Sequence, residues 1–95
     1  MPPSNPDFRP TACFSVQARS HPQLMPRVLD QFAKRGLVPT TWHGTAAGHD
    51  LGELHIDIQV EGMARELADY VAECLRRIVG VEAVLTSEKR RAESA

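Results

Sequence analysis

The sequence predicts an α+β domain in which four strands and two helices follow one another in the order βαββαβ. Two observations carry this prediction. Apolar and polar residues alternate cleanly in segments 11–19 and 54–60, whereas apolar residues recur every three or four positions in segments 23–35 and 63–79. A period of two is typical of a half-buried strand, and a period near 3.6 is typical of an amphipathic helix. With 95 residues, the chain is long enough for one domain.

The first strand is expected at 11–19 and the first helix directly after a short loop at 20–22. Pro26 sets the start of this helix near Gln23, because a residue without an N–H group is tolerated in the first turn, where donors are unpaired. Gly36 is expected to end the helix, since glycine readily adopts the left-handed conformation that follows a last turn.

The second strand is expected at 37–44 and the third at 54–60, joined by a hairpin-type connection at 45–52 that contains two glycines. Pro39 lies within the second predicted strand. Proline cannot donate to a neighbouring strand, so its presence indicates a strand at the edge of the sheet.

The second helix is expected at 63–79, where Gly80 ends it, and the last strand at 81–86. With right-handed crossovers, this order gives a four-stranded antiparallel sheet with both helices on one face, a ferredoxin-like plait whose second and fourth strands are the edges. Segment 1–10 holds four prolines and is expected to be a flexible leader, and the charged segment 87–95 a disordered tail. The domain itself is therefore assigned to 11–86.

Composition argues against several classes of function. The formal net charge is −1, and the aromatic residues are three Phe, one Tyr and one Trp, so neither a basic surface nor a set of stacking side chains indicates nucleic-acid binding. No segment approaches the ~20 apolar residues that a membrane span needs, and no signal peptide is evident. A cytoplasmic protein is expected.

Cys13 and Cys74 form no C-x-x-C motif and are interpreted as buried, reduced thiols.

The sequence shows no constellation of catalytic residues. Three histidines recur at six-residue steps around the predicted hairpin, but glycines separate them and no cysteine accompanies them, so we interpret them as solvated side chains and not as metal ligands. Asp50 and Glu53 are more simply turn residues than an acid–base pair. We therefore expect no catalytic, cofactor-binding or metal-binding residues in this chain. The three histidines are His43, His49 and His55.

Short motifs around the first helix and before the last strand suggest a family. They are Ala18-Arg19, Pro22, Arg27-Val28-Leu29, Arg35-Gly36 and Arg77-Ile78-Val79-Gly80-Val81. In this spacing, and over roughly residues 11–89, the chain resembles ACT domains, and more narrowly the short, isozyme II type small subunit of acetolactate (acetohydroxyacid) synthase.

This resemblance implies a non-catalytic regulatory subunit that activates a large catalytic subunit in branched-chain amino-acid biosynthesis. The large subunit would carry thiamine diphosphate, Mg²⁺ and FAD, and the small subunit no cofactor. A homodimer through an edge strand or the usual ACT interface is also implied. In many ACT domains an amino acid binds at the dimer interface, beside the loop before the first helix. The matching positions for an effector or partner here are Arg19, Ser20, His21, Pro22, Gln23 and Leu24, with Gly36, Leu37 and Val38 of a neighbouring chain.

The loop departs from the valine-sensing members that it resembles. Those members have an asparagine and a glycine where this chain has Ser20 and Gln23, and a second asparagine where it has Val38. An open helix N-terminus can donate N–H groups to a carboxylate, but Pro26 has no donor and the Gln23 side chain fills space that glycine would leave free. We therefore expect activation without valine feedback. The alternatives are a stand-alone ACT-type homodimer that binds an amino acid and regulates another target, or a small enzyme on the same fold.

Trp42, on the predicted edge strand, has two interpretations that the sequence leaves open. A large aromatic residue there can be buried beneath the sheet, or it can be exposed and anchor a partner.

Overall fold

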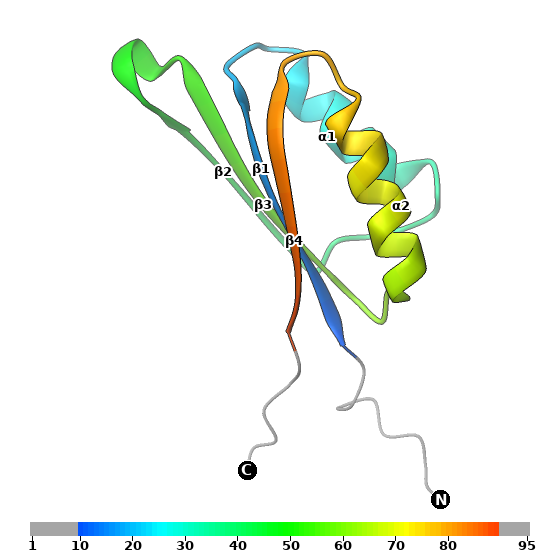
Figure 1. Cartoon of the computed structure of the whole chain (residues 1–95). Helices are drawn as coiled ribbons and strands as arrows, with labels where there is room; N and C mark the ends of the chain where they lie inside the picture. The colour runs from blue at the N-terminus through cyan, green and yellow to red at the C-terminus, as the bar shows by residue number, and fades with distance from the viewer. Residues whose placement is uncertain (1–9, 90–95) are drawn as a thin grey trace, which may run out of the picture.

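The computed structural model describes residues 10–89. They form one antiparallel sheet of four strands, in the order β2-β3-β1-β4, with both α-helices packed against one face (Figure 1). The edges of the sheet are therefore β2 and β4. This arrangement confirms the ferredoxin-like plait and the two edge strands that the sequence predicts. Among the described residues, no helix is long and apolar enough to cross a membrane.

The elements follow the predicted order. They are β1 (Thr11–Arg19), α1 (Leu24–Ala33), β2 (Thr41–Ala47), the single 3₁₀ turn η2 (His49–Leu51), β3 (Glu53–Glu61), α2 (Arg65–Arg76) and β4 (Val81–Lys89). Strand β1 pairs along its length with both β3 and β4, and β3 pairs with both β1 and β2, so β1 and β3 are the inner strands.

The register of the inner strands places their apolar side chains on the face that the helices cover, because residues directly opposite each other in an antiparallel pair point to the same side. Phe14 lies opposite Ile58 and Val16 opposite Ile56. From α1, Phe32 meets this layer, and its ring stands edge-on to that of Phe14 with 5.2 Å between centroids. All five side chains are almost completely buried. The opposite face of the sheet, here called the open face, is mostly polar.

The end of α1 is built as the sequence predicts. Gly36 has a φ of 72°, its N–H donates to the carbonyl of Ala33, and the N–H of Leu37 donates to the carbonyl of Phe32. These two bonds form a Schellman motif, which satisfies carbonyl groups that the helix leaves unpaired. The Gly36 of the Arg35-Gly36 motif therefore has a structural role.

Arg35 joins the two helices beside this helix end. One guanidinium nitrogen donates to the carbonyl of Gln31 at 2.6 Å and another to the thiol of Cys74 at 3.4 Å. The guanidinium also lies over the ring of Tyr70, 5.1 Å from its centroid. Gln31 is on α1, while Cys74 and Tyr70 are on α2, so this one side chain packs between both helices.

Strand β2 and helix α2 differ in extent from the prediction. Strand β2 begins at Thr41, so Pro39 precedes it, and the argument from a proline inside the strand was wrong even though the edge position is right. Helix α2 spans Arg65–Arg76 and not 63–79. Gly62 turns the chain with a φ of 73°, and Met63, 5% exposed, packs into the core before the helix begins.

Strand β4 is longer than predicted. Residues 87–89, assigned from their charge to a disordered tail, pair with residues 11–13 of β1. A charged sequence can pair in this way because the bonds use the backbone and the side chains stay exposed. The rest of the predicted tail, 90–95, and residues 1–9 of the predicted leader lie outside the described residues.

The thiols of Cys13 and Cys74 are free but only half-buried, so the expectation of full burial was wrong.

Candidate functional site: the loop before α1 and the exposed strand β2

The loop between β1 and α1, residues 20–23, lies at the end of the sheet where two other turns meet. The N–H of Arg19 donates to the carbonyl of Gly80 after α2, and the N–H of Ser20 donates to the carbonyl of Gly52 in the β2–β3 turn, both at 2.9 Å. The loop is thus anchored on both sides. Its residues are nevertheless exposed, and their side chains are accessible to a ligand or a partner.

Hydrogen bonds within this loop occupy much of the start of α1. The N–H of Gln23 donates to Nδ1 of His21 at 3.1 Å, and the N–H of Leu24 donates to the carbonyl of His21 at 3.0 Å. Pro22 and Pro26 have no N–H at all. The bond to Nδ1 requires that nitrogen to be unprotonated. The chain itself therefore satisfies some of the backbone donors that a free helix N-terminus would present to a carboxylate.

His21 is the residue whose role sequence reasoning missed. Its ring bonds to the backbone two positions later, as Asn and Asp side chains do in local turns. The neighbouring Pro22, which restricts the preceding backbone, was the only local signal for a fixed turn here.

Leu24 differs from the other predicted loop residues. It is the first residue of α1 and only 2% exposed, so its side chain belongs to the core. Arg19, by contrast, has a side chain that is 78% exposed and pairs with Glu82 at 3.4 Å. Leu24 can position the loop, whereas a ligand or partner can reach Arg19.

The second group of predicted site residues, 36–38, lies at the opposite end of α1 from the loop. A helix of 10 residues is about 15 Å long. Within one chain the two groups are therefore apart, and they can meet only if two chains associate. Val38 is 80% exposed and available for such a contact, while Leu37 is half-buried against the core.

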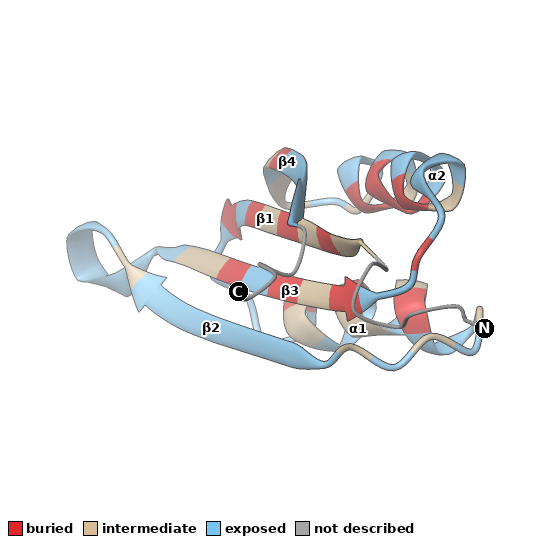
Figure 2. Cartoon of the chain, turned by 90° about the horizontal axis from the view of Figure 1, so that it is seen from below, coloured by how far each residue is buried: buried red, intermediate tan, exposed pale blue. Residues whose placement is uncertain are grey.

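Trp42 lies on the helix-covered side of β2, because its partner in the register is the core residue Ile58. It is 49% exposed, so the interpretation as a residue buried beneath the sheet was wrong. Helix α1 reaches β2 at Gly44, where an added Cβ would come within 2.8 Å of the Met25 side chain. Figure 2 shows β2 exposed along nearly its whole length. The role of Trp42 as a partner anchor stays a prediction.

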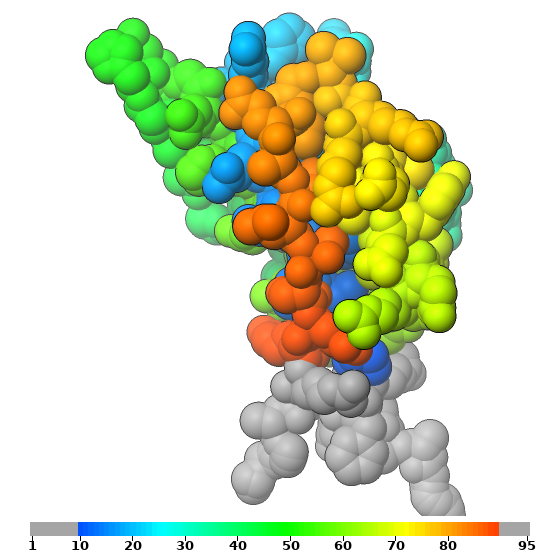
Figure 3. All heavy atoms as spheres, in the orientation of Figure 1, coloured from blue at the N-terminus to red at the C-terminus, as the bar shows by residue number. Residues whose placement is uncertain are grey.

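The β2–β3 hairpin projects beyond the rest of the molecule (Figure 3). At its tip, Asp50 and Leu51 both have positive φ values, 58° and 57°, which is uncommon for residues other than glycine. The side chain of Asp50 contacts that of His49 at 3.3 Å, and both are well exposed.

The three hairpin histidines do not converge. His43, opposite Asp57, and His55, opposite Thr45, both lie on the open face, while His49 is at the tip. Within residues 10–89, no three His, Cys, Asp or Glu side chains are grouped so that they could hold a metal ion.

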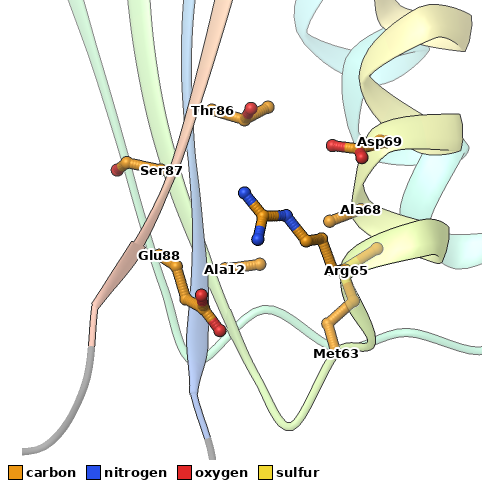
Figure 4. A pocket seen from close by; sticks show the side chains of 8 residues that line it. All are labelled: Ala12, Met63, Arg65, Ala68, Asp69, Thr86, Ser87 and Glu88. Atoms are coloured by element: carbon orange, nitrogen blue, oxygen red, sulfur yellow. The ribbon is translucent and has the colours of Figure 1, made fainter.

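A small hollow lies between the start of α2 and β4 (Figure 4). Its volume is about 70 Å³, well below the ~300 Å³ at which ligand pockets usually begin. The guanidinium of Arg65 extends into it, with Asp69 on the α2 side and Glu88 on the β4 side. We therefore do not assign an effector to this hollow.

The chain is an open plait with an accessible loop at the start of α1 and an exposed edge strand. The chain belongs to the ACT-like domain family, which matches it over residues 7–93. ACT domains are regulatory, non-catalytic modules that typically bind amino acids or other ligands.

Solved structures share this fold at low sequence identity. The ACT domain of GTP pyrophosphokinase from Chlorobium tepidum superposes with a TM-score of 0.71 and 13% identity, covering 83% of this chain and 99% of that chain. The C-terminal domain of the MgtC protein from Mycobacterium tuberculosis gives 0.68 and 14%, covering 97% and 99%. The regulatory subunit of aspartate kinase from Thermus flavus gives 0.64 and 15%, covering 88% and 53%. No curated protein sequence is significantly similar to this chain.

Proposed function

We propose that this protein is the small regulatory subunit of an acetolactate synthase and that it activates a large catalytic subunit without sensing valine. Membership of the ACT-like family supports the regulatory role, and the motifs around α1 and before β4 favour this particular partner. In this proposal the large subunit holds thiamine diphosphate, Mg²⁺ and FAD, and this chain holds none of them. Such a subunit would work in the cytoplasm.

The state of the loop before α1 carries the valine-insensitive part of the proposal. An amino-acid effector needs donors for its carboxylate, and backbone N–H groups at a helix start are a common source. Here the N–H groups of Ser20, Gln23 and Leu24 are already bonded within the chain. Binding valine would mean breaking these bonds or finding other donors, and either requirement lowers its affinity.

We further propose a homodimer in which the β2 strands of two chains pair in antiparallel fashion. Strands β1 and β2 run in the same direction, since each pairs antiparallel to β3. An antiparallel β2 pair therefore brings Val38 of one chain to the end of the other chain where residues 20–23 lie. This pairing would reunite the two groups of site residues and cover Trp42, and it would satisfy backbone groups that an edge strand leaves free.

An amino-acid-binding homodimer that regulates some other target is the second candidate. The observation that favours it is the pair of exposed guanidinium groups, Arg19 and Arg27, on either side of the loop. Guanidinium groups bind carboxylates strongly and could replace the missing backbone donors.

Co-elution with the large subunit separates these candidates. The purified protein would be mixed with the cofactor-loaded large subunit encoded in the same genome and passed over a sizing column at micromolar concentrations. We expect a stable complex. Two separate peaks, with the small protein intact and folded, would contradict the subunit proposal and leave the amino-acid-binding homodimer.

A further inference from the structure

A groove crosses the helix layer between the first turns of α1 and the turn that follows α2. Its two walls come from distant parts of the sequence. They meet because the start of α1 and the end of α2 lie at the same end of the sheet (Figure 1). Ile78 is half-buried, whereas Val79 is 84% exposed. The walls are formed chiefly by Pro26, Arg27 and Asp30 on one side and by Arg77, Ile78 and Val79 on the other.

The groove is electrostatically unbalanced. Arg27 donates a hydrogen bond only to the neutral side-chain oxygen of Gln23, at 3.3 Å, and within residues 10–89 neither Arg27 nor Arg77 forms an ion pair. Asp30 is the one carboxylate on the walls, against two guanidinium groups.

Other arginines of the chain contrast with these two. Arg19 pairs with Glu82 at 3.4 Å, and Arg76 pairs with Glu73 at 2.7 Å. Arg76 also donates to a backbone carbonyl of β4. The guanidinium groups of Arg27 and Arg77, neither of them in an ion pair, thus face one groove, next to Val79, the most exposed large apolar side chain of the described residues.

We propose that this groove docks an acidic segment of the large catalytic subunit, in which a carboxylate side chain neighbours an apolar one. The carboxylate binds between Arg27 and Arg77, where planar guanidinium donors match its two oxygens. The apolar side chain covers Ile78 and Val79 and removes that exposed surface from water. The inference rests on the proposed function and names the surface that contacts the partner.

A charge-reversal pair tests this docking surface. The variant Arg27→Glu/Arg77→Glu is compared with Lys34→Glu/Arg65→Glu, which changes the net charge equally at exposed positions outside the groove. Affinity for the immobilised, cofactor-loaded large subunit is measured by surface plasmon resonance, and circular dichroism checks that both variants are folded. We expect the groove variant to bind at least ~10-fold more weakly and the control to stay within ~3-fold of wild type.

The dependence on salt provides the second readout. Raising NaCl from about 0.05 M to about 0.5 M should weaken wild-type binding through screening and weaken the groove variant much less, since its charge contacts are already gone. The single variant Val79→Ala should bind the large subunit a few-fold more weakly than wild type, with the same salt dependence as wild type.

The outcomes distinguish the inference from the function on which it rests. If wild type binds the large subunit and the groove variant binds equally well, the docking inference is overturned and the proposed function stands. If both double variants lose affinity equally, general charge and not this groove governs binding, and the inference is again overturned. If wild type does not bind at all, both fall.

Discussion

The inner strand β1 and the edge strand β2 both pair with β3 but have opposite environments. Strand β1 buries every second residue beneath the helices, while six of the seven residues of β2 are exposed. The polypeptide thus builds its core from β1, β3, the two helices and Val84 of β4, and it leaves β2, with Trp42 and the projecting hairpin, uncovered. Strand β2 therefore contributes little to the core and is available for association.

The largest effect should come from removing a core ring. Phe32→Ala would delete the side chain that stands edge-on against Phe14, both completely buried. We expect the free energy of unfolding to fall by about 3–5 kcal/mol. Urea denaturation followed by circular dichroism measures this loss, and a near-neutral result would show that α1 does not pack on the sheet as described.

The next largest effect would be the rise in thermal stability on binding of an amino acid, if the loop could bind one. A ligand at a hundredfold excess over its Kd stabilises a protein by about 2.7 kcal/mol. Because the loop bonds its own donors, we expect millimolar valine to leave the melting temperature unchanged in differential scanning fluorimetry. A clear rise in the melting temperature would show that valine binds even though the loop around His21 bonds its own donors.

A smaller loss is expected at the end of α1. In Gly36→Ala the added Cβ meets no atom within 4 Å, so the cost arises only from the positive φ of 72°. We expect a loss of about 1 kcal/mol in the free energy of unfolding. Gly36→Asn is the matched control and should lose less, because asparagine tolerates the left-handed conformation. Equal losses in both variants would argue against backbone strain as the cause.

The edge strand should give only a modest change in monomer stability but a large change in association. Trp42→Ala removes a side chain that is already 49% exposed, so we expect unfolding of the monomer to change by less than about 1.5 kcal/mol. Sedimentation equilibrium should nevertheless show a weaker dimer. A dimer of unchanged affinity would exclude the β2 edge as its interface, and a loss as large as that of Phe32→Ala would erase the contrast between core and edge.

The sequence predicted the element order, the sheet edges and the core face because periodicity depends on local side-chain chemistry. It missed the end of β4, since residues 87–89 pair through backbone groups that charge patterns do not report. The face of Trp42 depends on its register with Ile58, and the bond from Gln23 to His21 depends on a ring orientation. The groove needs two distant segments, so no local pattern could indicate it.

The most direct test of the account is the rate of acetolactate formation by the cofactor-loaded large subunit, measured with and without this protein and with and without valine. We predict that the protein raises the rate and that valine does not reverse the increase. An unchanged rate at saturating small subunit would contradict the regulatory role, and a rise that valine abolishes would contradict the account of the loop before α1.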